Sequence, residues 1–165
     1  MSRRRTAAGG AGLALQRLVD MISHRSGAVL TIMSDASVTL PQVLLLSRVA
    51  AIGSTSPSDI ALEAQASAPA ASQMIERLVQ QGLLLRKEAP DDRRRKVISP
   101  TARARSLLRK LEAARAADYE LGLAPLSSEL RNAMAMLLQR AVDELAGARE
   151  NRRRRRRVAK MEVER

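Results

Sequence analysis

The sequence predicts a mainly α-helical fold that contains one small β-hairpin. The apolar residues are almost entirely Ala, Leu, Val, Ile and Met, and Ala and Leu favour helix. Apolar positions recur at spacings of three and four along most of the 165 residues. The exception is a pair of short runs, LLLRKE at 83–88 and KVISP at 96–100, which flank a polar turn and predict two paired strands.

Four helices are predicted before the hairpin, at about residues 13–35, 39–52, 57–64 and 68–81. Pro41 and Pro57 stand at helix starts, where the missing N–H of proline costs nothing. Gly53 and Gly82 stand where helices are expected to stop. Residues 1–12 are rich in Arg, Gly and Ala, and we expect them to be disordered.

Two further helices are predicted after the hairpin. The first begins after Thr101 and runs to about residue 120, with Leu107, Leu108 and Leu111 facing inward. The last begins near Ser127, and its apolar residues form one stripe: Leu130, Met134, Leu137, Leu138, Ala141 and Leu145. We therefore expect a single domain at 13–148 and an Arg-rich tail at 149–165.

The composition excludes several classes of function. The chain has no cysteine, which excludes disulfides and cysteine-ligated metals. His24 is the only histidine, which disfavours a zinc site built from histidines and a Ser-His-Asp triad. We therefore expect no enzyme, no cofactor and no metal. No apolar run approaches the roughly 20 residues of a membrane helix, so we expect a cytoplasmic protein without a membrane partner.

The positive charge of the chain is concentrated in one internal segment and the two termini. The net charge is +12, and residues 86–110 hold ten bases against three acids. Residues 151–165 hold eight bases against two acids. Such clustering fits a phosphate backbone better than a generally solvated surface. Double-stranded DNA is therefore the expected partner.

The segment SDIALEAQASAPAASQMIERLVQQGLLLRKEAPDDRRRKVISPTARA, residues 58–104, resembles the MarR family of winged helix-turn-helix transcription regulators. A short helix, turn, recognition helix, strand, wing and Thr-led helix follow in the order of that family. Asp92-Arg93-Arg94 matches its Asp-x-Arg wing signature. The resemblance covers about residues 13–146. It implies a helix-turn-helix and wing at about 39–100 and dimerisation helices at about 13–35 and 101–148.

One face of the recognition helix is expected to meet DNA. Burial of Ala71, Met74, Ile75 and Leu78 would turn the opposite face outward, and this face would enter the major groove. The candidate contacts on it are Pro69, Ala70, Ser72, Gln73 and Arg77. The amide of Gln73 can pair with adenine, whereas Arg77 is expected at phosphate. The alternative is an ordinary exposed face of a surface helix.

The polar turn PDDRRRK, residues 90–96, is expected to form the tip of the wing. A carboxylate near a guanidinium orients it before DNA arrives. In this interpretation Asp92 orients Arg94, which reaches into the negative minor groove. Arg93, Arg95 and Lys96 would contact the DNA backbone. The alternative is a solvated turn with ion pairs of little energetic value.

The resemblance implies a homodimer that reads a pseudo-palindromic operator, and a repressor that a small anion or phenolic compound releases. Candidate dimer residues are Leu18, Ile22, Leu137, Ala141 and Leu145, and His24 and Arg48 would border an effector cavity. Two alternatives remain: a non-specific architectural DNA-binding protein and a winged-helix module that binds protein. The run NRRRRRR, residues 151–157, is either a solvated tail, as frayed helix or disorder, or an arm along phosphates.

Replacing Arg94 by alanine should weaken operator binding by at least about 1–3 kcal/mol, because the wing loses its groove-reaching cation. Asp92→Asn should cost less, since it only impairs the aim of that cation. A mobility-shift titration at fixed salt measures both effects, with the dimer mass as a control for folding. Unchanged affinity for Arg94→Ala would refute the assignment of the wing.

Overall fold

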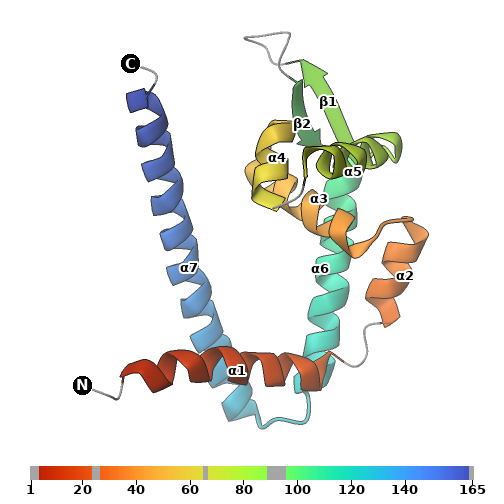
Figure 1. Cartoon of the computed structure of the whole chain (residues 1–165). Coiled ribbons are helices and arrows are strands. Elements are labelled where there is room, and N and C mark those ends of the chain that lie inside the picture. Colours follow the sequence, from red (N-terminus) through yellow and green to blue (C-terminus); the bar gives the residue numbers. More distant parts are fainter. Residues whose placement is uncertain (1–3, 24–26, 65–66, 89–95, 164–165) are drawn as a thin grey trace. The chain divides into compact units, whose positions relative to one another are not determined.

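The structure is a computed structural model that describes residues 4–23, 27–64, 67–88 and 96–163 (Figure 1). The chain divides into two compact units, residues 1–121 and 122–165. The helices are α1 (Arg4–Ile22), α2 (Gly27–Asp35), α3 (Leu40–Ile52), α4 (Pro57–Ala64), α5 (Ala68–Gln80), α6 (Ala102–Leu123) and α7 (Ser128–Val163), and the strands are β1 (Leu84–Glu88) and β2 (Lys96–Pro100). The predicted mainly α fold with one hairpin is confirmed.

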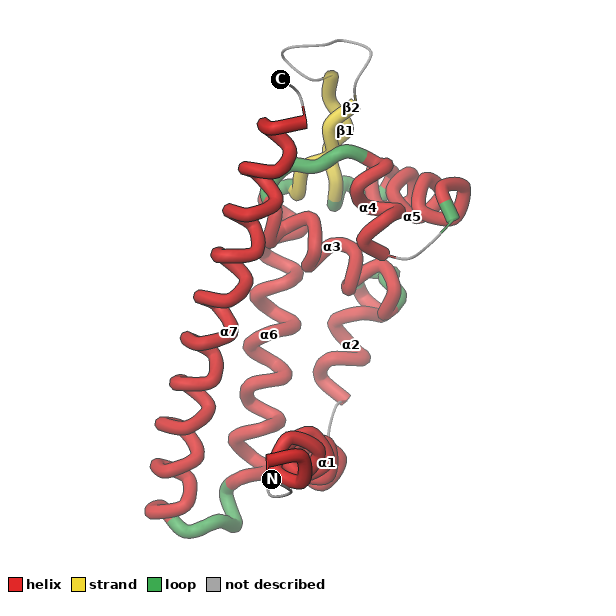
Figure 2. The backbone as a smooth tube through the Cα atoms, turned by 60° about the vertical axis from the view of Figure 1, so that its left-hand side comes forward, coloured by secondary structure: helices red, strands yellow, loops and turns green. Residues whose placement is uncertain are grey.

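The two strands form an antiparallel hairpin in which Leu84 lies opposite Pro100 and Glu88 lies opposite Lys96. Thr55, between α3 and α4, adds a bridge to Ile98 of β2. The Thr55 N–H donates to the Ile98 carbonyl at 3.0 Å, and the Ile98 N–H donates to the Thr55 carbonyl at 2.8 Å. Helices α3, α4 and α5 all contact the hairpin, beside which they lie in Figure 2. The hairpin is thus attached to the helices on several sides.

One hydrophobic core joins α3, α5, α6 and the hairpin. Its largest fully buried side chains are Leu46, Val49, Leu78, Leu83, Leu84 and Ile98. Leu107, Leu108 and Leu111 of α6 join the same cluster, as their spacing predicts. Each helix and strand that contributes a residue to this cluster removes apolar surface from water. The burial favours their association by about 25 cal/mol for each Å² of apolar surface.

The polar groups at helix starts agree with the sequence pattern. The Thr39 N–H donates to Gln42 Oε1 at 2.8 Å, which closes a capping box on α3. The hydroxyl of Thr101 donates to the carbonyl of Gly82 at 2.9 Å and accepts from the Ala104 N–H at 3.1 Å. Thr101 therefore caps the start of α6 and also bonds to the turn at which α5 ends. Gly82 has φ +67° in that turn, a conformation that favours glycine.

The prediction of one long helix at 13–35 is wrong. Helix α1 ends at Ile22, with the Ser23 N–H bonded to the Val19 carbonyl at 2.9 Å, and α2 begins at Gly27. The sequence from the end of α1 to the start of α2, SHRSG at residues 23–27, contains serine and glycine, which lower helix propensity, and no large apolar side chain. The same apolar face on both sides of this segment therefore does not require a continuous helix.

Helix α1 begins at Arg4, inside the segment 1–12 for which the sequence predicts disorder. The alanines of this segment favour helix, whereas its glycines oppose it. At the other end, α7 continues as helix through the Arg-rich segment to Val163. Arginine is itself a good helix former, so the composition of the tail does not end the helix.

Within the described ranges, no single helix is long and apolar enough to cross a membrane. Among the described helices, only α2 and α3 together reach that length and composition, and the chain bends by 82° between them. Five residues of α3 are buried in the protein.

Leu78→Ala should lower the free energy of unfolding by about 2–5 kcal/mol, because the cavity forms where α5 meets the core. Leu85→Ala is the matched control, since Leu85 is 45% exposed and Leu78 is 0% exposed. Urea denaturation at one protein concentration measures both variants. Equal losses for the two leucines would contradict this description of the core.

Candidate nucleic-acid interface

Helix α5 has one buried face and one exposed face. Ala71, Ile75 and Leu78 are 1%, 2% and 0% exposed, and Met74 is half-buried. The exposed face consists of Pro69, Ala70, Ser72, Gln73, Glu76 and Arg77. All five candidate contacts on this helix therefore lie on the side that faces solvent, as predicted. Glu76 is the one acid among the residues of this face.

The first turn of α5 is suited to a close approach by another molecule. The Ser67 hydroxyl accepts from the Ala70 N–H at 3.4 Å, and a proline stands in the first helical positions. Residues 68–70 are Ala, Pro and Ala, and the first turn contains no acidic residue. Small side chains and the positive end of the helix dipole both favour an approaching phosphate.

The far end of α5 is attached to the turn between α2 and α3. The Gln81 side-chain amide donates to the Ser37 carbonyl at 2.8 Å, and Ser37 has φ +53°. The other amide atom, Gln81 Oε1, is buried and has no hydrogen-bond partner in the structure. This contact joins residues 44 positions apart, so the sequence carried no signal for it. It adds a polar attachment to the apolar packing that orients α5.

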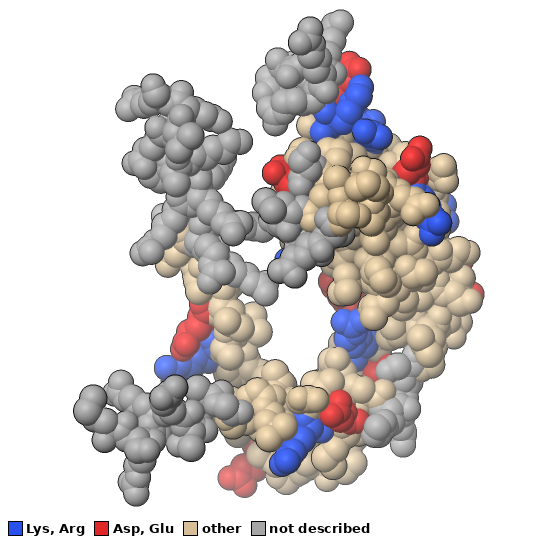
Figure 3. Space-filling model, in the orientation of Figure 1, with Lys and Arg blue, Asp and Glu red and all other residues tan. Residues whose placement is uncertain are grey.

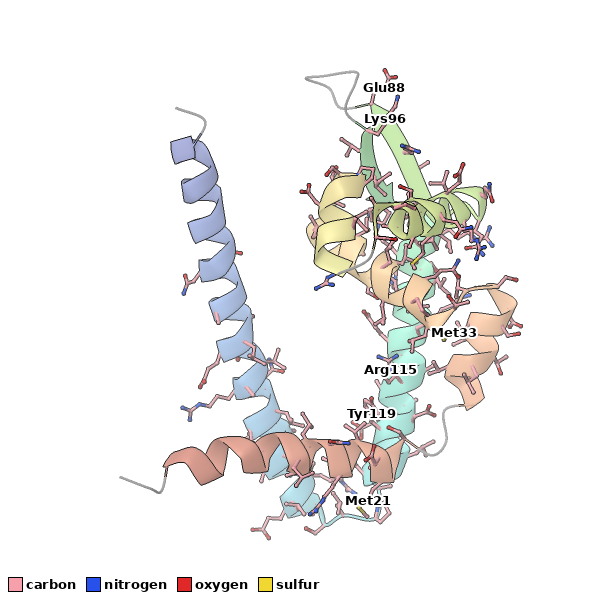
Figure 4. The ribbon with its side chains drawn as sticks, in the orientation of Figure 1. Met21, Met33, Glu88, Lys96, Arg115 and Tyr119 are labelled. Atoms are coloured by element: carbon pink, nitrogen blue, oxygen red, sulfur yellow. The ribbon has the colours of Figure 1, made fainter. Side chains whose placement is uncertain are left out.

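The outer end of the hairpin carries an ion pair between its strands. Lys96 Nζ lies 2.9 Å from Glu88 Oε1, and the two side chains are 41% and 54% exposed. Figure 4 shows them together at the end of the strands. An exposed pair of this kind contributes at most about 1 kcal/mol, so a phosphate can replace the carboxylate. The other predicted wing residues, Asp92, Arg93, Arg94 and Arg95, lie outside the described residues.

Two further cations lie on the hairpin. Arg86 and Lys87 of β1 are exposed, and Leu84 is the one buried residue of this strand. Figure 3 shows Lys and Arg side chains gathered over the hairpin. Sequence reasoning assigns both residues to a basic segment only. The alternation of side chains along a strand is the signal that could have placed them on opposite faces of β1. Arg86 and Lys87 add two cations to β1, the strand that contacts α5.

The structure describes only one of the two predicted effector residues. Arg48 is exposed on α3. His24 lies outside the described residues. The effector cavity therefore stays a prediction. Over the part of the chain that the structure describes, no group of three or more His, Cys, Asp or Glu side chains could hold a metal ion.

Helix α7 exposes a long apolar stripe. Leu137 and Leu145 are 68% and 62% exposed, and Leu130, Leu138, Ala141 and Val142 are also exposed. Among the other candidate dimer residues, Ile22 is buried within the single chain and Leu18 is half-buried. Apolar surface of this extent on one helix commonly marks a protein interface.

A short helix, a second helix with an exposed polar face, and a hairpin with cationic strands define a winged helix-turn-helix protein. The sequence model of the MarR family matches residues 38–96, which contain both helices and β1 and end at the first residue of β2. The predicted resemblance to the MarR family is therefore confirmed over this segment of the chain.

The solved structures that resemble this chain have the same fold. The YusO protein from Bacillus subtilis matches with a TM-score of 0.61 and 25% identity, over 86% of this chain and 99% of its own. The MepR–DNA complex from S. aureus matches with a TM-score of 0.61 and 23% identity, over 79% of this chain and 98% of MepR. The transcriptional regulator Tm0710 from Thermotoga maritima matches with a TM-score of 0.70 and 18% identity, over 82% of this chain and 93% of Tm0710. A search of curated proteins found no match.

Proposed function

We propose that this protein is a dimeric repressor that binds a pseudo-palindromic operator in double-stranded DNA. The observation that carries the proposal is the exposed face of α5, which combines a first turn of small residues with Ser72, Gln73 and Arg77. A helix of this kind fits the major groove with its N-terminal residues at the base edges. The DNA in the MepR complex, a protein of the same fold, supports the choice of partner.

Each exposed side chain of α5 has a distinct role in this proposal. Pro69 and Ala70 allow the helix to approach the groove, because neither side chain extends far. Gln73 contacts a base, since its amide can donate and accept in one plane and so match adenine. Ser72 donates to a base or a phosphate. Arg77, one turn further along, binds phosphate and sets the register without reading sequence.

The hairpin supplies a second set of contacts beside the first. Arg94 enters the minor groove in an orientation set by Asp92, and Arg93 and Arg95 contact the adjacent backbone. Lys96 exchanges its carboxylate partner for a phosphate, a change that costs little because the Glu88 pair is exposed. The exposed cations of β1, Arg86 and Lys87, attract further phosphates of the same duplex.

Dimerisation through the apolar stripe of α7 explains two observations together. It removes from water the exposed leucines that a monomer leaves solvated. It also produces two copies of α5, which suits half-sites about 34 Å apart, one turn of DNA. Leu137, Ala141 and Leu145 are the residues that we assign to this interface.

A small anion or phenolic compound is the proposed effector. Arg48 is exposed on α3, and α3 contacts both α4 and β2. An anion bound there would therefore touch a helix that packs against two parts of the DNA-binding segment. His24 is the second residue that we assign to this site. Release follows if the effector binds the DNA-free protein more tightly than the DNA-bound one.

Footprinting on the DNA upstream of the protein's own gene tests the proposal. The expected result is a protected pseudo-palindrome that persists in an excess of random competitor DNA. Protection that spreads along the fragment and disappears with competitor would favour the non-specific architectural function, for which the Arg-rich segment of α7 is the supporting observation.

Gln73→Ala should reduce affinity for the preferred sequence by about 1–3 kcal/mol and leave random DNA almost unaffected, because the change removes only hydrogen bonds to a base. Gln80→Ala is the matched control, since Gln80 is exposed at the other end of the same helix. Fluorescence anisotropy on both DNAs measures the two variants. If the Gln73→Ala variant loses the same affinity for the preferred sequence as for random DNA, Gln73 does not read a base.

Leu137→Glu should increase the dimer dissociation constant by at least about tenfold, since it places a charge in an apolar interface at a cost above about 1.4 kcal/mol. Leu44→Glu is the control, because Leu44 is 61% exposed on α3 and outside the proposed interface. Sedimentation velocity over a dilution series measures the dissociation. A Leu137→Glu dimer as stable as the parent would exclude this stripe from the interface.

A further inference from the structure

Helix α7 changes character along its length. Residues 128–148 contain two bases and three acids and carry the exposed apolar stripe. Residues 149–163 contain eight bases and two acids, and six arginines stand in succession at 152–157. The helix continues through both parts without a break. The basic part lies beyond the residues that the family model matches, and the helix-turn-helix and wing do not account for it.

The helical backbone gives the arginine run a defined geometry. Six successive helical residues extend about 9 Å and turn through more than one full revolution. Over that length a B-form duplex presents about five phosphate charges. Because successive residues are turned by about 100°, roughly half of the six positions lie on any one side of the helix, so one copy of the run can meet a few of these phosphates.

The arginine run is unfavourable in isolation. Like charges three and four residues apart in a helix repel one another, and this run contains several such pairs. Neutralisation by a row of anions removes the repulsion and releases the counterions of the anions. A polyanion is thus a better occupant than a single small ion.

We propose that residues 152–157 form a second, sequence-independent DNA-binding element that contacts the phosphates of duplex DNA. The inference rests on the proposed function, since it takes the operator-binding dimer as the protein that carries the arm. Duplex DNA is favoured because the other basic segment of the chain, residues 86–110, lies around the hairpin of a helix-turn-helix fold. A membrane surface is disfavoured, because an interfacial helix needs an apolar face and six consecutive arginines leave none in this run.

The salt dependence of binding to a random-sequence 30-base-pair duplex tests the arm. The full-length protein is compared with a variant in which all six arginines of 152–157 are replaced by glutamine, which keeps helix propensity. The slope is that of the logarithm of the binding constant against the logarithm of the salt concentration. In the glutamine variant it should be shallower by about 0.9 for each phosphate that the arm no longer neutralises, which amounts to several units for a dimer. Replacement of the same six residues by lysine should preserve the slope, because the charge is kept.

Three results would overturn the proposal. The glutamine variant could retain the slope of the parent, or the lysine variant could show a slope as shallow as that of the glutamine variant. The third is that a duplex RNA of the same length shows the full decrease in slope while DNA shows none. A chain that ends at residue 150 serves as a second variant should the glutamine protein fail to fold, and the same slope is measured.

The arm and the proposed function fail in different measurements. Because phosphate contacts carry no sequence information, the glutamine variant should weaken operator and random DNA by the same factor. The ratio of the two affinities therefore reports on α5, whereas the salt slope reports on the arm. A full-length protein that shows no preference for its operator would refute the proposed function and leave the slope comparison intact.

Discussion

The burial of one face of α5 is the constraint on which the rest of the proposed interface depends. Ala71, Ile75 and Leu78 are buried where α5 packs against the rest of the helix-turn-helix segment, and Ile75 and Leu78 enter a core shared with α3, α6 and both strands. A helix has only one remaining face once this one is buried, so the packing also decides which side chains solvent and DNA can reach. The identity of Gln73 matters for recognition only because this packing turns it outward.

Short polar contacts connect that core to the hairpin and the neighbouring helices. Thr101 bonds to the turn that ends α5, Thr55 pairs with β2, and Gln81 bonds to the turn before α3. Each contact joins segments that are distant in sequence, so none stabilises a single element alone. Together with the core, they hold the exposed face of α5 and the cationic strands as parts of one compact unit. A DNA-binding surface needs this fixed spacing, because phosphates along a duplex are regularly spaced.

Much of the fold could be predicted from the sequence because local signals agreed. Helix α5, for example, has a serine cap, a proline in its first turn, apolar residues at spacings of three and four, and a glycine two residues beyond its end. The end of α1 at Ile22 is not predicted by the sequence, because the apolar face continues in register from α1 to α2. The Glu88–Lys96 pair and the Gln81–Ser37 bond depend on strand register and on tertiary packing, which spacing alone does not fix. The sequence assigns Arg86 and Lys87 to a basic segment but to no particular surface.

The absence of cysteine makes one measurement especially direct. Ser72→Cys introduces a single thiol on the exposed face of α5, and Ser128→Cys introduces one at the exposed start of α7 as a control. The rate of alkylation of each thiol is measured with and without saturating DNA from upstream of the protein's own gene. Insertion of α5 into the major groove predicts strong protection of the thiol at position 72 and little protection at position 128. Equal alkylation rates at position 72 in free and DNA-bound protein would contradict the assignment of α5 as the recognition helix.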